Sequence, residues 1–265
     1  MHFNFAFTAV QVLWTLTLAA HLVLLVVLLG RDRIRRFRWF FTGIALVTFR
    51  LIASRLLFGR MPQLVLGETF LVLGFISVVV GLLVLVELSR MTFRNATPPA
   101  WGMGITASLT ISALALAVMG PWPALVSIVP NSLMNAVNLL QLLTQKGGIA
   151  VDLLSVCLGL LSVFFGRRCG TGWRLHPQLV IIGLSTASLG QLATQLIWQA
   201  IAKSAAPHSM AEYVHIMDLR EKLLNANSVI YVVVLIWWIL WLWFDEPGAR
   251  LSTDETTGSE GPAAA

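Results

Sequence analysis

The sequence predicts an all-α membrane protein, a bundle of seven transmembrane helices, and three observations support this class. First, 57% of its 265 residues are hydrophobic and 11% are charged, whereas soluble domains carry about 45–50% apolar and about 25% charged residues. Second, the apolar residues form runs of about 20 residues, the length of helix that crosses a hydrocarbon core. Third, basic residues gather in the short connections between these runs, as the positive-inside rule describes.

Seven apolar runs have the length and composition of spanning helices. In chain order they are residues 5–29, 39–58, 65–86, 101–119, 148–165, 179–202 and 223–244. The first run has no basic segment before it and continues for about 25 residues, which favours a membrane helix over a cleaved signal peptide.

The positions of the basic residues predict that the N-terminus lies outside and the C-terminus in the cytoplasm. The first connection, RDRIRRFR at residues 31–38, is the most basic segment of the chain. The basic residues of the other inner segments are Arg90, Arg94, Arg167, Arg168, Arg174 and Arg250. Most of the cationic side chains lie inside in this orientation, as the positive-inside rule requires. A multi-pass location in the plasma (inner) membrane is expected.

The polar outer-side segment 122–147 is the place where the helix count could change. Residues 124–144 are long enough to span, and an eight-helix arrangement distributes the basic residues equally well. Amide side chains gather on one arc of a helix through this segment: Asn131, Asn135, Asn138, Gln141 and Gln145. Pro123 and Pro130 interrupt the start of such a helix. We therefore predict an amphipathic outer segment that leads into the fifth spanning helix at Gly147 and Gly148.

Residues 1–246 form the predicted membrane bundle, and residues 247–265 are expected to be a disordered cytoplasmic tail. The tail is polar, rich in small residues and without apolar periodicity, so it cannot bury a core. The net charge of +6 is interpreted as a topology signal and as a contact for anionic lipid headgroups at the Arg-rich inner loops, not as a nucleic-acid surface.

Arg50 is the most unusual residue of the apolar runs. The segment TFRLIASRLLFGR at residues 48–60 repeats arginine every five positions, at Arg50, Arg55 and Arg60. This spacing turns successive side chains by about 140° around a helix, so they do not form the charged stripe of a voltage sensor. Arg50 falls near the middle of its run, where inserting an arginine costs about 2.5–3.5 kcal/mol. It either pairs with a buried polar group or binds an anion or carboxylate in the bundle interior.

Two intramembrane carboxylates are candidate partners for the arginines. Glu68 lies one short loop after Arg55, so we predict an Arg55–Glu68 ion pair near the outer surface. Asp152 is expected near the outer end of the fifth helix. If Glu68 and Asp152 both pair with other groups near the outer surface, no evident carboxylate remains near the midplane to pair with Arg50.

Three glutamines, Gln191, Gln195 and Gln199, follow one another at a spacing of four in the sixth run. This spacing places them along one helix face. They either form hydrogen bonds between helices or line a cavity together with Arg50. The candidate ligand-binding residues are therefore Arg50, Gln191 and Gln195.

The sequence gives little support for catalysis or for a metal or cofactor site. The histidines lack the spacing of motifs such as HExxH, and Cys157 and Cys169 lack that of a disulfide or metal site. Ser185, in GLSTA, would need His21 from the first helix as a base. Residues 223–244 contain no lysine, so a retinal has no attachment point. We expect no catalytic residue, no metal and no cofactor.

The leading functional hypothesis is a non-enzymatic membrane protein that senses or binds a small ligand and acts through a separate membrane or cytoplasmic protein. The alternative is a small-solute transporter or channel. That function would need a polar path from residues 131–145 past Arg50 and Gln195 to the inner loops. A membrane-embedded enzyme ranks third.

Overall fold

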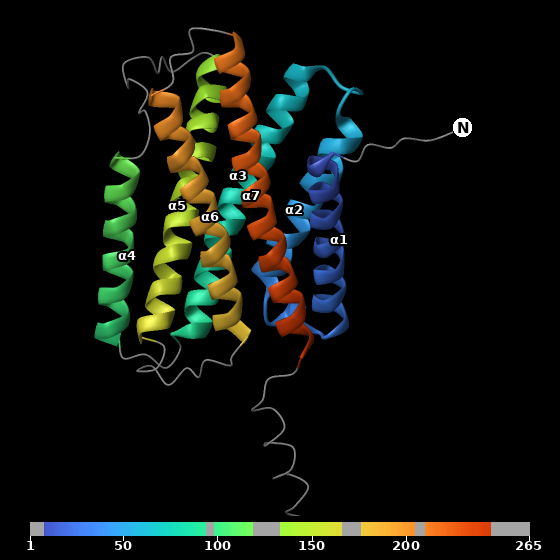
Figure 1. The fold of residues 1–265 in the computed structure, drawn as a ribbon. Coiled ribbons are helices and arrows are strands. Elements are labelled where there is room, and N and C mark those ends of the chain that lie inside the picture. The colour runs from blue at the N-terminus through green and yellow to red at the C-terminus, as the bar shows by residue number, and fades with distance from the viewer. Residues whose placement is uncertain (1–7, 94–97, 119–132, 166–175, 205–209, 245–265) are drawn as a thin grey trace, which may run out of the picture.

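The computed structural model describes residues 8–93, 98–118, 133–165, 176–204 and 210–244, and this part of the chain forms seven α-helices and one 3-10 turn (Figure 1). In order they are α1 (Ala9–Gly30), η1 (Arg33–Arg35), α2 (Arg38–Leu57), α3 (Gln63–Thr92), α4 (Pro98–Val118), α5 (Leu133–Phe165), α6 (His176–Ser204) and α7 (Met210–Trp243). The helices other than α4 are long and apolar enough to cross a membrane. In α4 the qualifying apolar stretch, Gly104–Ala117, is shorter. The predicted all-α membrane bundle is confirmed.

Consecutive helices run in alternating directions, and η1 with the ends of α1 and α7 marks one end of the bundle (Figure 1). This end carries the basic connection 31–38, so we call it the inner end and the opposite one the outer end. Gly59 ends α2 at the outer side with a φ of 77°, a left-handed conformation that glycine adopts readily. Pro62 then precedes α3.

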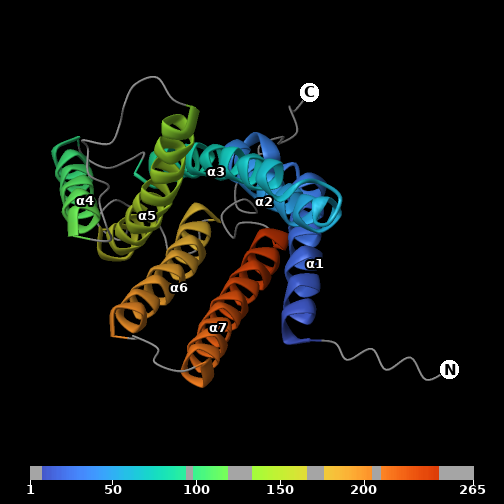
Figure 2. The same cartoon turned by 90° about the horizontal axis from the view of Figure 1, so that it is seen from above.

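Six helices form a closed ring when the bundle is seen along its axis (Figure 2). The order around the ring is α1, α2, α3, α5, α6 and α7, and α7 packs back against α1. Helix α3 also contacts α6 across the ring. Among the described helices, α4 packs against α5 alone and lies outside the ring. The ring is therefore closed by the first and last helices of the chain.

Helix α5 starts earlier than the apolar run 148–165 indicates. It begins at Leu133 and continues without a break through Gly147 and Gly148. Its 33 residues give a length of about 50 Å, so its first turns extend beyond a hydrocarbon core of about 30 Å. Residues 133–147 thus belong to α5 and form no separate spanning helix. Residues 122–132 and the tail 247–265 lie outside the described residues.

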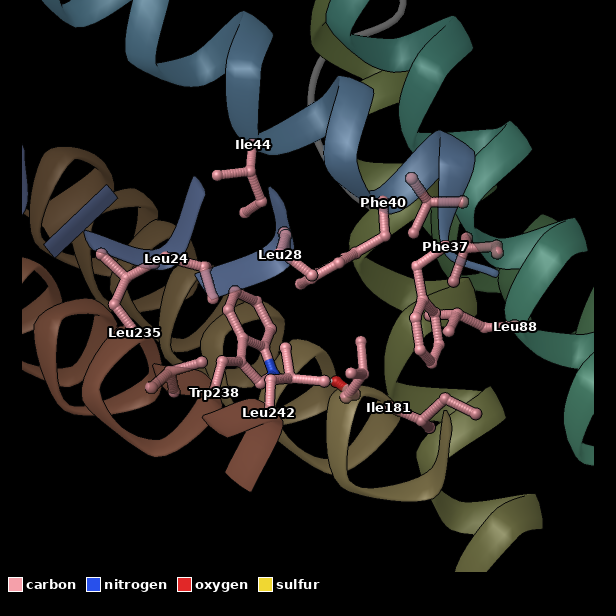
Figure 3. Packing of buried hydrophobic residues seen from close by; sticks show 14 of the residues in the cluster. Leu24, Leu28, Phe37, Phe40, Ile44, Leu88, Ile181, Leu235, Trp238 and Leu242 are labelled. Atoms are coloured by element: carbon pink, nitrogen blue, oxygen red, sulfur yellow. The ribbon is translucent and has the colours of Figure 1, made fainter. Parts of the chain in front are cut away.

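The packed hydrophobic core lies in the inner half of the bundle, and all six ring helices contribute to it (Figure 3). Its buried members are Leu24, Val27, Leu28, Phe37, Phe40, Ile44, Val80, Val84, Leu85, Leu88, Leu158, Val180, Ile181, Val234, Leu235, Trp238 and Leu242. Phe40 of α2 and Trp238 of α7 meet edge to face across the ring, with 5.1 Å between ring centroids. In contrast, none of the described side chains in residues 9–20 of α1 or 210–233 of α7 is buried. The bundle is closed at its inner half, and its outer half is loosely packed along α1 and α7.

Glu87 of α3 fixes the position at which α2 begins. Its carboxylate accepts hydrogen bonds from the backbone amides of Trp39 and Phe40, each at 3.1 Å from Oε2. The N-cap residue of α2, Phe37, has no capping side chain of its own. A negative group at a helix N-terminus satisfies free N–H groups and interacts favourably with the helix dipole. Glu87 therefore holds the turn of α2 that places Phe37 and Phe40 in the core.

Replacing Glu87 with alanine should lower the free energy of unfolding by about 1–3 kcal/mol, because partly buried amides lose their acceptor. Thermal unfolding of the purified protein in detergent, followed by tryptophan fluorescence, measures this change. Glu68→Ala is the matched control, since Glu68 is an exposed glutamate near the other end of the same helix. Equal melting temperatures for both variants would contradict this role of Glu87.

Candidate functional site

Polar contacts between helices lie directly outward of the hydrophobic core. We call the following pairs the polar layer: Arg50–Ser77 between α2 and α3, Asp152–Ser188 between α5 and α6, Gln191–Asn227 between α6 and α7, and His21–Tyr231 between α1 and α7. Core residues follow within two turns on the inner side, such as Leu24 after His21 and Val234 after Tyr231. The polar layer therefore lies at the outer edge of the hydrophobic core.

Arg50 is half-buried in α2 and faces α3. Its Nη1 donates to the hydroxyl of Ser77 at 3.2 Å, and that hydroxyl donates to the carbonyl of Leu73 at 2.8 Å. One of the five N–H donors of the guanidinium is thus satisfied by a neutral group. Within the described residues, no ion pair involves Arg50. The side chain has a polar partner, but its charge is not compensated by a carboxylate.

The predicted Arg55–Glu68 ion pair does not form within the described part of the chain. Arg55 instead lies over the ring of Trp14 in α1, with 5.8 Å from its Cζ to the ring centroid. Both Arg55 and Glu68 are exposed, and an exposed ion pair gains little in stability. A cation–π contact across the α1–α2 seam takes its place.

The three glutamines of α6 do not form one site with Arg50. Gln191 accepts a hydrogen bond from Nδ2 of Asn227 at 2.7 Å. The buried Oε1 of Gln195 has no hydrogen-bond partner within the described residues. Gln199 is half-buried further outward. Helix α2 does not pack against α6, so no direct contact joins the glutamines to Arg50.

Asp152 is half-buried in the seam between α5 and α6, where the Ser188 side chain forms a hydrogen bond with its carboxylate. One turn further in, the Ser185 hydroxyl donates to the carbonyl of Ser155 at 2.7 Å. A Cβ placed on Gly159 would overlap with Ser185. Small residues thus let the two helices approach closely, as in other membrane helix pairs.

Buried His21 and half-buried Tyr231 form a pair that the sequence did not reveal. Nδ1 of His21 lies 2.7 Å from the carbonyl oxygen of Thr17, and Nε2 lies 2.9 Å from the Tyr231 hydroxyl. A carbonyl can only accept, so Nδ1 carries the proton and Nε2 accepts from Tyr231. Helix α1 does not pack against α6, so His21 is not placed beside Ser185. The available signal was that His21 and Tyr231 are the only ionisable residues in the apolar runs 5–29 and 223–244.

The basic connection between α1 and α2 is also a structural element. Arg33 donates from Nη2 to the carbonyl of Phe244 at 2.8 Å, and its Nη1 lies 2.9 Å from Nε2 of His176. A cation at a helix C-terminus interacts favourably with the helix dipole. Arg31 lies against the ring of Trp243, at 5.4 Å from its centroid. The arginines that predict the orientation of the chain thus also join α1, α6 and α7.

Within the described residues, no group of three His, Cys, Asp or Glu side chains could hold a metal ion. Cys157 is a free, partly buried thiol, and Cys169 lies outside the described part. Comparisons with protein-family models, with curated proteins and with solved structures found no match. The role of this protein is therefore inferred from the geometry of its own residues.

Replacing Tyr231 with phenylalanine should destabilise the protein by about 0.6 kcal/mol, and by no more than about 1.7 kcal/mol, the range for hydrogen bonds between membrane helices. The other tyrosine of the chain, Tyr213, is exposed, so Tyr213→Phe provides the control. Thermal unfolding in detergent compares the two variants. A larger loss in the Tyr213 variant would show that the His21–Tyr231 contact does not stabilise the ring.

Proposed function

We propose that this protein is a multi-pass sensor of the plasma (inner) membrane that binds a small anionic ligand from the outer side. The observation that carries the proposal is Arg50, a half-buried cation whose hydrogen-bond partner is the neutral hydroxyl of Ser77. A carboxylate ligand can accept two parallel hydrogen bonds from a guanidinium, which makes arginine the usual residue for such recognition. The ligand would supply the charge that the described residues do not provide.

The packing of the ring supports access from the outer side. The outer parts of α1 and α7 contain no buried side chain among the described residues, whereas the inner half is filled by the hydrophobic core. Phe37, Phe40 and Trp238 close the inner half below the polar layer. A small molecule could reach the depth of Arg50 more easily from the outer side, where α1 and α7 are loosely packed.

Helix α2 supplies a route from the ligand to the inner surface. Arg50 and Phe40 are ten residues apart in the same helix, a distance of about 15 Å. An anion that draws Arg50 away from Ser77 would shift α2 against α3, where Glu87 holds its first turn. Small shifts of packed helices are a common way of passing on a binding event. A separate protein, or anionic lipid headgroups, would then contact the basic connection at residues 31–38.

The second candidate function is transport of the same small solute. It requires a polar path to the inner loops, and the ring has the apolar core in that position. Transport would therefore need a second state in which the inner half opens. Uptake of a stabilising compound into proteoliposomes separates the two functions, since a sensor accumulates none.

Arg50→Gln should abolish stabilisation by an anionic ligand, while the variant still inserts into the membrane. Melting temperatures are measured in detergent with acetate, succinate, glutamate and inorganic phosphate at millimolar concentrations. A compound present at 100 times its dissociation constant should stabilise the original protein by about 2.7 kcal/mol.

Arg55→Gln is the matched control, because Arg55 lies on the same helix but is exposed beside Trp14. It should retain the full response. The proposal is wrong if the Arg50 variant responds as strongly as the original protein. It is also wrong if loss of Arg50 removes the protein from membranes altogether, because Arg50 would then be needed for folding.

A further inference from the structure

The side chain of His176 connects three segments at the inner end of the bundle. His176 is the first residue of α6, and its side chain is buried. Its Nε2 lies 2.9 Å from Nη1 of Arg33 in η1. The same nitrogen lies 3.1 Å from the carbonyl oxygen of Trp241 and 3.0 Å from that of Phe244, at the end of α7. One ring nitrogen therefore has close polar neighbours from two other segments of the chain.

These contacts cannot all be hydrogen bonds at the same time. A guanidinium can only donate, so a hydrogen bond from Arg33 requires a lone pair on Nε2 of His176. A carbonyl oxygen can only accept, so a hydrogen bond to Trp241 or Phe244 requires a proton on that nitrogen. A ring nitrogen carries either a lone pair or a proton. The position of Nε2 therefore suits two protonation states, and each state satisfies different neighbours.

In the neutral state, Arg33 joins α6 to α7. With the ring proton on Nδ1, Nε2 of His176 accepts from Nη1 of Arg33, and Nη2 of the same guanidinium donates to the Phe244 carbonyl at 2.8 Å. A cationic donor at the C-terminal end of a helix also interacts favourably with the helix dipole. A neutral ring with its proton on Nε2 would instead turn an N–H group toward the N–H groups of Arg33. The first arrangement therefore matches the contacts of a neutral His176.

In the protonated state, His176 takes the place of Arg33 at the end of α7. An imidazolium carries a proton on both ring nitrogens, so Nε2 becomes a donor. The carbonyls of Trp241 and Phe244 are already within hydrogen-bond distance of it. Arg33 loses its acceptor and meets a second positive charge at 2.9 Å, a repulsion that is larger in a buried site than in water. The proton therefore transfers the end of α7 from Arg33 to His176.

We propose that His176 and Arg33 form a proton-dependent latch at the inner end of the bundle. The latch is closed when neutral His176 accepts from Arg33, and it opens when His176 is protonated. Histidine is the side chain whose charge ordinarily changes between pH 5 and 8. Opening leaves α6 joined to α7 and releases the connection at residues 31–38 from both helices. Acidification on the inner side therefore frees the most basic segment of the chain.

Other ionisable side chains are few at the inner ends of the helices that pack against α6. Residues 232–244 of α7 contain none, and residues 153–165 of α5 contain Cys157. On α3, Glu87 accepts from the first amides of α2, and Arg90 is exposed. The ionisable residues nearest in sequence to the latch lie outside the described residues: Arg174, Asp245 and Glu246. Within the described part of the chain, Arg33 is the charged group that contacts His176.

The effect of Arg33→Gln on the melting temperature in detergent, measured at pH 8 and at pH 5.5, tests the latch. In the original protein this substitution should lower the melting temperature by several degrees at pH 8. At pH 5.5 the loss should be at most about half as large, because protonated His176 repels Arg33. In a His176→Gln background the loss should be equal at both pH values, since an amide stays uncharged. The difference between the two backgrounds measures the coupling of Arg33 to His176.

His215→Gln is the matched control background, because His215 is an exposed histidine in the outer part of α7. There the Arg33→Gln loss should depend on pH as in the original protein. The latch is overturned if the loss in the original protein is the same at both pH values, or if it still depends on pH when His176 is Gln. If that variant fails to fold, His176→Asn takes its place. Arg50→Gln should leave the result unchanged, so the latch and anion binding at Arg50 are tested independently.

Discussion

The carboxylate of Glu87 at the start of α2 is the contact on which the inner half of the bundle depends. It satisfies two backbone amides that the sequence of α2 leaves without a cap, and it sets the rotation of the first turn. That rotation directs Phe37 and Phe40 into the ring, where Phe40 meets Trp238 from the opposite wall. The backbone of α2 packs only beside α1 and α3 among the spanning helices, and the Phe40 side chain reaches across the ring to Trp238 of α7.

In the proposed function, the inner half of the ring provides stability and the outer half binds the ligand. The inner half gains its stability from apolar burial and from Arg33, which joins the α1–α2 connection to the C-terminus of α7. The outer parts of α1 and α7 have no buried side chain among the described residues, and regions with few buried contacts open at lower free energy than the core. The proposed binding from the outer side would therefore need little reorganisation of α1 and α7, and the packed inner half would move as a unit.

Hydropathy and charge predicted the fold, because membrane insertion is decided by the length of apolar runs and by the side on which arginines lie. The seams between helices could not be predicted in the same way. Arg55 and Glu68 are close in sequence, yet Trp14 from another helix takes the arginine. The glutamines share a helix face, yet Gln191 pairs with Asn227 of α7 while Oε1 of Gln195 has no partner among the described residues. His21 and Tyr231 are paired by the closure of the ring, which a single sequence does not encode locally.

The energy of Arg50 argues against a purely structural role. Placing an arginine at the centre of a membrane helix costs about 2.5–3.5 kcal/mol, while a hydrogen bond between membrane helices returns at most about 1.7 kcal/mol. Ser77 provides one such bond, and the described residues provide no carboxylate to supply the remainder. A leucine at position 50 would make the free energy of membrane insertion more favourable and would pack against α3. Arg50 therefore lowers the stability of the folded protein, and the proposed anionic ligand would compensate its charge.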